Sequence, residues 1–151
     1  MLERLFPRTV DNDYRGNRLA LWALVPVTIV TLVRSSIHVF RADGGAQSIA
    51  TIPLDTYGDP AAAAVITIFA LWGLSQLLLG LLYAVVLIRY RVLVPLMYLT
   101  LIVEYLGRLA IGSWKPLETL ARPPGARFTV VMIVLSVVMF ALSLRKRPHG
   151  G

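Results

Sequence analysis

The sequence has no cysteine, only two histidines and a charged fraction of 15% in 151 residues. Without cysteine there are no disulfides, thiolate metal sites, iron–sulfur clusters, covalently attached haem or cysteine nucleophiles. A haem held by two imidazoles would need a symmetric dimer, because His149 lies in the C-terminal tail and only His38 lies in an apolar block. His38 and Glu104 alone are too few ligands for a metal ion. The sequence therefore offers little material for redox or metal chemistry.

Apolar residues, in contrast, make up 57% of the chain, and the mean hydropathy is +0.71. Soluble domains carry about 45–50% apolar and about 25% charged residues. The apolar residues form four blocks, at about 19–40, 61–88, 92–114 and 128–144. Each approaches the length of about 20 residues that a membrane span needs, and none alternates with period two. The sequence predicts an all-α integral membrane bundle of four transmembrane helices in up-down topology.

The basic residues predict the orientation of this bundle. Nine of the fifteen Lys and Arg residues lie in the N-terminal arm (1–18), the turn after the second block and the tail (145–151): Arg4, Arg8, Arg15, Arg18, Arg89, Arg91, Arg145, Lys146 and Arg147. The opposite side has four: Arg41, Lys115, Arg122 and Arg127. The positive-inside rule then predicts cytoplasmic termini and a plasma membrane location, which in a bacterium is the inner membrane. The net charge of +7 reflects orientation and anionic lipid, and we expect no nucleic-acid partner.

Two loops connect the blocks on the side opposite the termini. The loop 41–60 has turn-forming Gly and Pro residues, and the favoured interpretation is a plain connector. The alternative is that its apolar middle, 49–54, lies on the membrane or caps the bundle. The segment 114–122 has Trp114 at its start and Leu117 and Leu120 on one helical face. This spacing predicts a short interfacial helix that Trp114 anchors among the lipid headgroups.

Three charged residues fall inside the predicted spans: Arg34, Glu104 and Arg108. A charge at the centre of a span costs about 2.5–3.5 kcal/mol on insertion scales, so such residues are candidates for function. With a rise of 1.5 Å per residue, Arg34 lies about 22 Å from the cytoplasmic end of its span, Glu104 and Gln76 about 18 Å, and Arg108 about 24 Å. Four polar groups from three helices therefore share one layer, slightly outside the midplane.

The candidate site consists of this layer and its neighbours: Arg34, His38, Gln76, Glu104, Tyr105 and Arg108. In one interpretation Glu104 pairs with Arg108, and the polar groups only hold the helices together. In another, the net positive charge binds a lipid phosphate, a quinone carbonyl or a small organic anion. A third is a contact with another subunit. Trp72 is expected to be core or lipid-facing filler, with ligand contact as the less favoured alternative.

The leading functional hypothesis is a small membrane protein that acts as an accessory or scaffolding subunit, or that binds a lipid-like ligand in the outer half of the bundle. The alternative is an oligomeric transporter or channel in which Glu104 is the coupling carboxylate. An enzyme ranks third, because reactive groups are few. We expect no cofactor other than a bound lipid or quinone. The expected partners are membrane lipids and either other membrane subunits or further copies of this chain.

Overall fold

The computed structural model describes residues 2–121 and 124–145. Within this part of the chain the regular structure is entirely helical: α1 (Leu2–Leu5), α2 (Arg18–Phe40), the 3₁₀ turn η1 (Leu54–Thr56), α3 (Asp59–Arg89), the 3₁₀ turn η2 (Arg91–Leu93), α4 (Val94–Trp114) and α5 (Pro124–Leu144). The four long helices lie where the four apolar blocks predicted them. Their bounds differ from the predicted ones by four residues or fewer.

Three helical segments are long and apolar enough to cross a membrane: Arg18–Phe40, Asp59–Arg89 and Arg91–Trp114. The apolar part of α5, Phe128–Leu144, is shorter. Many large apolar side chains point away from the protein, among them Ile68, Leu78 and Val131 at about 60% exposure. Such exposure fits contact with lipid and would be costly in water. By length and composition, the chain is a membrane protein.

Local signals set the helix ends. The side chain of Asn17 accepts a hydrogen bond from the backbone N–H of Leu19 at 2.8 Å, which caps the first turn of α2. Pro60 and Pro95 lie in the first turns of α3 and α4, where a missing N–H costs nothing. Between these helices, η2 closes the short turn at residues 90–93. This turn connects the end of α3 directly to the start of α4.

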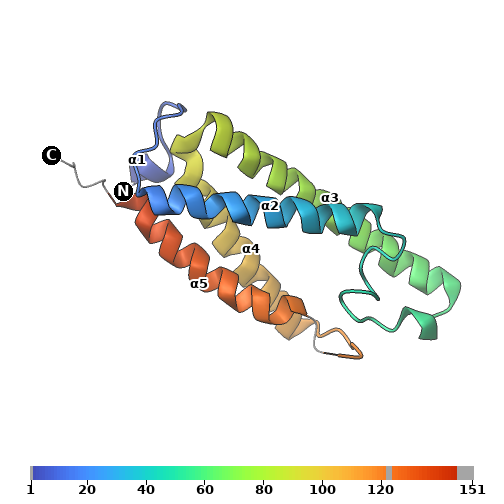
Figure 1. The fold of residues 1–151 in the computed structure, drawn as a ribbon. Helices are drawn as coiled ribbons and strands as arrows, with labels where there is room; N and C mark the ends of the chain where they lie inside the picture. Colours follow the sequence, from blue (N-terminus) through green and yellow to red (C-terminus); the bar gives the residue numbers. More distant parts are fainter. Residues whose placement is uncertain (1, 122–123, 146–151) are drawn as a thin grey trace.

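Successive long helices run in alternate directions and form two pairs, α2 with α3 and α4 with α5 (Figure 1). At one end of the molecule the N-terminal arm covers the helix ends, and we call this the arm end. At the other end lie the loop 41–58 and the segment 115–121, and we call this the loop end. The two pairs are close at the arm end and separate toward the loop end (Figure 1).

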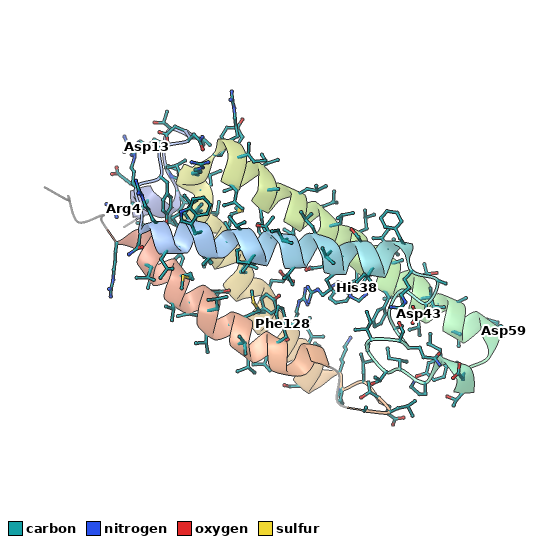
Figure 2. The ribbon with its side chains drawn as sticks, in the orientation of Figure 1. Arg4, Asp13, His38, Asp43, Asp59 and Phe128 are labelled. Carbon is teal, nitrogen blue, oxygen red and sulfur yellow. The ribbon has the colours of Figure 1, made fainter. Side chains whose placement is uncertain are left out.

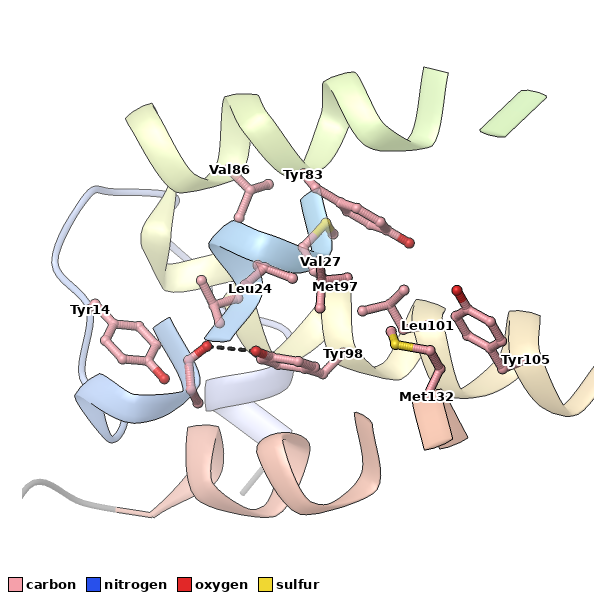
Figure 3. Close-up of a cluster of buried hydrophobic side chains, with 12 residues drawn as sticks. Tyr14, Leu24, Val27, Tyr83, Val86, Met97, Tyr98, Leu101, Tyr105 and Met132 are labelled. Carbon is pink, nitrogen blue, oxygen red and sulfur yellow. Dashed lines mark hydrogen bonds between the residues drawn. The ribbon is translucent and has the colours of Figure 1, made fainter. Parts of the chain in front are cut away.

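The apolar core lies in the half of the bundle toward the arm end (Figure 3). Leu24 of α2, Tyr83 of α3, and Tyr98 and Leu101 of α4 are buried there together, and Met132 of α5 packs against them. The hydroxyl of Tyr98 donates a hydrogen bond of 2.6 Å to the carbonyl of Ala20 (Figure 3). Packing and this hydrogen bond therefore join the two helix pairs at the arm end.

The N-terminal arm strengthens the same end. Arg4 Nη1 donates to the carbonyl of Leu144 at 2.6 Å, and the N–H of Asn17 donates to the carbonyl of Leu142 at 3.3 Å. These two bonds satisfy carbonyls in the last turn of α5, which no helical N–H can reach. The arm thus ties α5 to the start of α2.

The loop 41–58 has a small apolar core of its own at the loop end. Ala46, Ile52 and Leu54 are buried, and they pack against Ile66 and Phe69 of α3. The apolar middle of the loop, 49–54, thus covers part of α3, so the loop is more than the plain connector that the sequence favoured. Gly44 and Gly45, with φ of +59° and +74°, turn the chain sharply after α2.

The predicted interfacial helix at 114–122 is wrong. Helix α4 ends at Trp114, and residues 115–121 are not helical. The backbone N–H of Leu120 donates to the carbonyl of Thr51 at 2.9 Å, and the carbonyl of Ala121 accepts from the Thr51 hydroxyl at 2.9 Å. The backbone groups of Leu120 and Ala121 thus bond to Thr51 in the loop 41–58 instead of forming a helical turn within their own segment. The predictions for Arg122 and for the tail residues Lys146, Arg147 and His149 lie outside the described residues.

Candidate functional site

Close packing of α2 on α3 positions the polar groups of the site. Gly73 and Gly80 of α3 face α2, and a Cβ atom on Gly73 would lie 2.6 Å from the Cβ of His38. A Cβ on Gly80 would lie 2.9 Å from Cδ2 of Leu32. Small residues allow this approach in lipid, where close contact is a main source of helix association. Arg34 of α2 and Gln76 of α3 are placed side by side as a result.

Arg34 and Arg108 converge on one acceptor. Nη2 of Arg108 donates to Oε1 of Gln76 at 2.6 Å, and Nη2 of Arg34 approaches the same oxygen at 3.5 Å. Arg108 also forms an ion pair with Glu104, one turn earlier on α4. The predicted layer is therefore present, with α2, α3 and α4 each contributing to it.

The indole ring of Trp72 completes this group. The Cζ atom of Arg108 lies 4.9 Å from the centre of the Trp72 ring, and the Cζ atom of Arg34 lies 5.7 Å from it. Both distances are within the range of cation–π attraction. We call Arg34, Trp72, Gln76, Glu104 and Arg108 the arginine cluster. The sequence alone favours a filler role for Trp72, and only its place among the helices shows that two cations share its ring.

The charges of the arginine cluster do not balance. It contains two guanidinium groups and one carboxylate, and Glu104 is paired with Arg108. Within the described part of the chain, Arg34 has no carboxylate at ion-pair distance, although Asp and Glu are the natural partners of an arginine inside a membrane. The cluster thus has a net charge of +1, and Arg34 is its uncompensated cation.

Donors in the cluster are also left over. The Nε atoms of Arg34 and Arg108 are buried and have no hydrogen-bond partner. The side chains of Arg108 and Glu104 are 20% and 16% exposed, so the cluster is shielded but not sealed. A buried donor without a partner costs about 1–3 kcal/mol, and more if it is charged. An added acceptor at this place would therefore be stabilised strongly.

Two further buried hydroxyl groups lack partners in the described chain, those of Tyr83 on α3 and Ser136 on α5. The hydroxyls of Tyr83 and Tyr105 both point into the space between the helices that carry them (Figure 3). Tyr105 is 3% exposed, and the Cζ atom of Arg108 lies 5.0 Å from its ring centre. Together with Nε of Arg34 on α2 and Nε of Arg108 on α4, this means that each of the helices α2 to α5 has one buried polar atom without a partner in the described chain.

His38 lies in the last turn of α2, toward the loop end (Figure 2), and in the described chain its side-chain hydrogen bond goes to the loop 41–58. Its ring centre is 4.8 Å from that of Trp72. Its Nδ1 atom is 2.7 Å from the carbonyl of Gly44, and because a carbonyl only accepts, Nδ1 carries the hydrogen. His38 therefore links Trp72 to the first residues of the loop 41–58.

Asp43 holds the start of this loop (Figure 2). Its carboxylate accepts hydrogen bonds from the backbone N–H groups of Gly45 and Ser48, at 2.9 and 2.8 Å, and lies 3.4 Å from Arg41 Nε. Partial burial raises the pKa of Asp43, but the hydrogen bonds from Ser48 and Gly45 and the charge of Arg41 together lower it to about 2. The loop is thus pinned by a carboxylate that stays ionised at any ordinary pH.

All six predicted site residues lie in one region, on α2, α3 and α4. Direct contacts run from Arg34 to Gln76, from Gln76 to Arg108 and from Arg108 to Glu104. Tyr105 packs against Arg108 and is hydrogen-bonded to Arg34, and His38 packs on Trp72. Within the described residues, no three His, Asp or Glu side chains gather closely enough to hold a metal ion. The chemistry available here is the binding of an anion by two guanidinium groups next to aromatic rings.

Comparisons of the chain with protein-family models, with curated proteins and with solved structures found no match.

Proposed function

We propose that this chain is an integral membrane protein of four spans, with both termini in the cytoplasm, that binds an acidic amphiphile through the arginine cluster. In this proposal the loop end faces the outside, and the cluster lies in the outer half of the membrane. The ligand has an oxyanion headgroup, either a carboxylate or a phosphate, and an apolar tail. The fourth span is α5, whose 21 residues would rise about 31 Å, close to the thickness of the hydrocarbon layer.

The observation that carries the proposal is the uncompensated guanidinium of Arg34. It is held beside Arg108 on a shared acceptor, with one buried Nε atom on each side chain left without a partner. An oxyanion would neutralise the excess charge and accept from these donors, in the geometry that guanidinium groups prefer. The apolar surroundings favour a ligand with an apolar tail over a free small anion.

The transporter alternative finds less support at the same residues. A coupling carboxylate has to gain and lose a proton or cation during each cycle, but Glu104 is ion-paired with Arg108. The pair would have to break for each turnover. The accessory-subunit role remains compatible with ligand binding, because a lipid-binding bundle can also be part of a larger complex.

The test measures binding of oleate, phosphatidylglycerol, phosphatidylcholine and inorganic phosphate to the purified full chain in neutral detergent, by native mass spectrometry. We expect oleate or phosphatidylglycerol to bind more tightly than phosphatidylcholine, and inorganic phosphate to bind weakly. Arg34→Gln should lower the affinity about tenfold or more, since a charge-assisted hydrogen bond contributes about 1.5–3 kcal/mol. Arg34→Lys keeps the charge and should lose less.

Arg89→Gln is the matched control, because it removes the same charge from an exposed position at the arm end of α3. It should bind as the unchanged protein does. The proposal is wrong if the acidic amphiphiles bind no better than phosphatidylcholine, or if Arg34→Gln and Arg89→Gln have equal effects.

A further inference from the structure

Hydrogen bonds join the α2–α3 pair to the α4–α5 pair at three levels. At the arm end, Tyr98 donates to Ala20, and Asn17 to Leu142. In the middle, Arg108 donates to Gln76. At the loop end, Thr51 binds the segment after α4. The helix pairs diverge from the first level to the last (Figure 1), so the third contact closes the wide end.

The contact at the loop end is compact, and we call it the latch. It consists of Thr51 with Leu120 and Ala121. The Thr51 carbonyl accepts from Leu120 N–H at 2.9 Å, and its hydroxyl donates to the Ala121 carbonyl at 2.9 Å and lies 3.4 Å from the Ala121 N–H. The bonded residues are about 70 positions apart in the sequence. A single threonine therefore joins the two loops.

Thr51 adopts a backbone conformation that is unfavourable for its residue type. Its φ is +58°, and it is the one non-glycine residue of the described chain with a positive φ. A β-branched side chain is strained in this region, and such strain clusters in clamps and switch regions. The latch therefore holds a strained residue in place with three weak, partly exposed contacts, and it opens more easily than the core at the arm end.

A chain of contacts leads from the latch loop to the arginine cluster. The loop is bonded to His38 through the Gly44 carbonyl, His38 packs on Trp72, and Trp72 lies under Arg108. When the latch opens, the contacts of the arginine cluster remain between the two pairs: the Arg108–Gln76 hydrogen bond, the packing of Arg108 on Trp72, and the side-chain hydrogen bond between Arg34 and Tyr105. An anion that takes over the donors of Arg108 would then loosen the Arg108–Gln76 hydrogen bond as well.

We propose that the loop 41–58 is a lid on the arginine cluster, closed by the latch, and that an acidic amphiphile enters and leaves between the two helix pairs only when the latch opens. This inference rests on the proposed function, since it concerns access to the same site. It assigns the latch a kinetic role: the latch controls the rates of binding and release and leaves the contacts of the bound ligand unchanged.

Because the natural chain has no cysteine, the latch can be locked without interference from other thiols. The variant Thr51→Cys/Ala121→Cys places two thiols at the latch. In the full chain in neutral detergent, stopped-flow fluorescence follows a dansyl-labelled fatty acid as an excess of oleate displaces it. We expect oxidation of the pair to slow release at least tenfold, and reduction to restore the rate. Thr51→Gly relieves the strain and removes the hydroxyl contacts, so it should speed release.

The control is Thr51→Cys alone, whose release rate should not respond to oxidant. If the dansyl fatty acid binds but oxidation of the double variant leaves its release rate unchanged, the lid is wrong and the proposed function stands. If the unchanged protein binds no acidic amphiphile, the proposed function fails instead. If the double variant does not form its disulfide, a release rate for Thr51→Gly equal to that of the unchanged protein overturns the lid.

Discussion

At the scale of single residues, Arg34 is distinguished by what it lacks. Its guanidinium has a long hydrogen bond to Gln76, a hydrogen bond with the Tyr105 side chain and a distant indole ring, but no carboxylate at ion-pair distance in the described chain. The sequence places Arg108 at about the same depth in its predicted span as Arg34. Arg108, however, forms an ion pair with Glu104 and a short hydrogen bond to Gln76. Depth alone cannot separate these two arginines, since the difference depends on which helix faces each side chain.

Two buried tyrosines differ in their hydrogen bonding. Tyr98 and Tyr83 are both fully buried, but only Tyr98 has a hydrogen-bond partner, the carbonyl of Ala20. Tyr98→Phe should lower the free energy of unfolding by about 1 kcal/mol, the usual net contribution of such a bond. Thermal unfolding in mild detergent measures the loss.

Tyr83→Phe is the control for this prediction, since it removes a hydroxyl with the same burial and no partner. It should be neutral or slightly stabilising, because an unsatisfied polar atom leaves the core. Equal losses for both variants would show that the Tyr98–Ala20 bond does not stabilise the fold.

At the scale of elements, the packing of α2 on α3 depends on glycine. Gly73 meets the backbone and the Cβ of His38, and Gly80 meets Leu32, so both positions are closed to larger residues. The close packing of α3 on α2 positions Trp72 and Gln76 against α2, and it therefore sets the geometry of the site. A change of helix spacing here should therefore affect both stability and the arginine cluster.

The second prediction tests this contact with Gly73→Ala. The added Cβ would lie 2.6 Å from the Cβ of His38, and overpacking of this kind costs about 1–3 kcal/mol. Thermal unfolding in detergent should show the loss, and binding of oleate should weaken with it.

Gly107→Ala on α4 is the matched control, because a Cβ there meets nothing within 4 Å. Alanine is a better helix former than glycine by about 0.8–1.0 kcal/mol, so this variant should be neutral or stabilised. A Gly73→Ala protein as stable as the Gly107→Ala protein would contradict the close packing of α2 and α3.

At the scale of the whole molecule, stability is uneven along the bundle. The arm end has the apolar core, the Tyr98–Ala20 bond and the arm contacts to α5. The arginine cluster lies in the middle, and the loop end has the latch and the small apolar core of the loop 41–58. Local opening is expected where buried apolar contacts are few and hydrogen bonds are exposed, which is the loop end. The end of the bundle that is expected to open locally is thus the end where the ligand is proposed to enter.

The third prediction concerns how the whole chain crosses the membrane. Single cysteines are introduced at three exposed positions, Arg8→Cys, Glu118→Cys and Arg145→Cys, into a chain that has no others. With both termini cytoplasmic, a membrane-impermeant maleimide added to intact cells should label only Glu118→Cys. Labelling of Arg8→Cys and Arg145→Cys should need permeabilised cells.

The outcomes separate the possible arrangements. Labelling of Arg145→Cys from outside together with Glu118→Cys would mean that α5 does not cross the membrane. Labelling of Arg8→Cys and Arg145→Cys from outside, without labelling of Glu118→Cys, would reverse the orientation that the basic residues predict.

The sequence by itself determined the helices and the common level of the polar groups along them. Apolar runs of this length leave few alternatives to helix in lipid, and position along a helix translates directly into depth, so Arg34, Gln76, Glu104 and Arg108 could be assigned to one layer. Only the tertiary structure decided which side chains meet. The pairing of both cations with Trp72, the closure of the loops by Thr51 and the extended segment 115–121 depend on contacts far apart in the chain. Local patterns cannot encode these, because the rotation of each helix and the path of each loop are set by the surfaces packed against them.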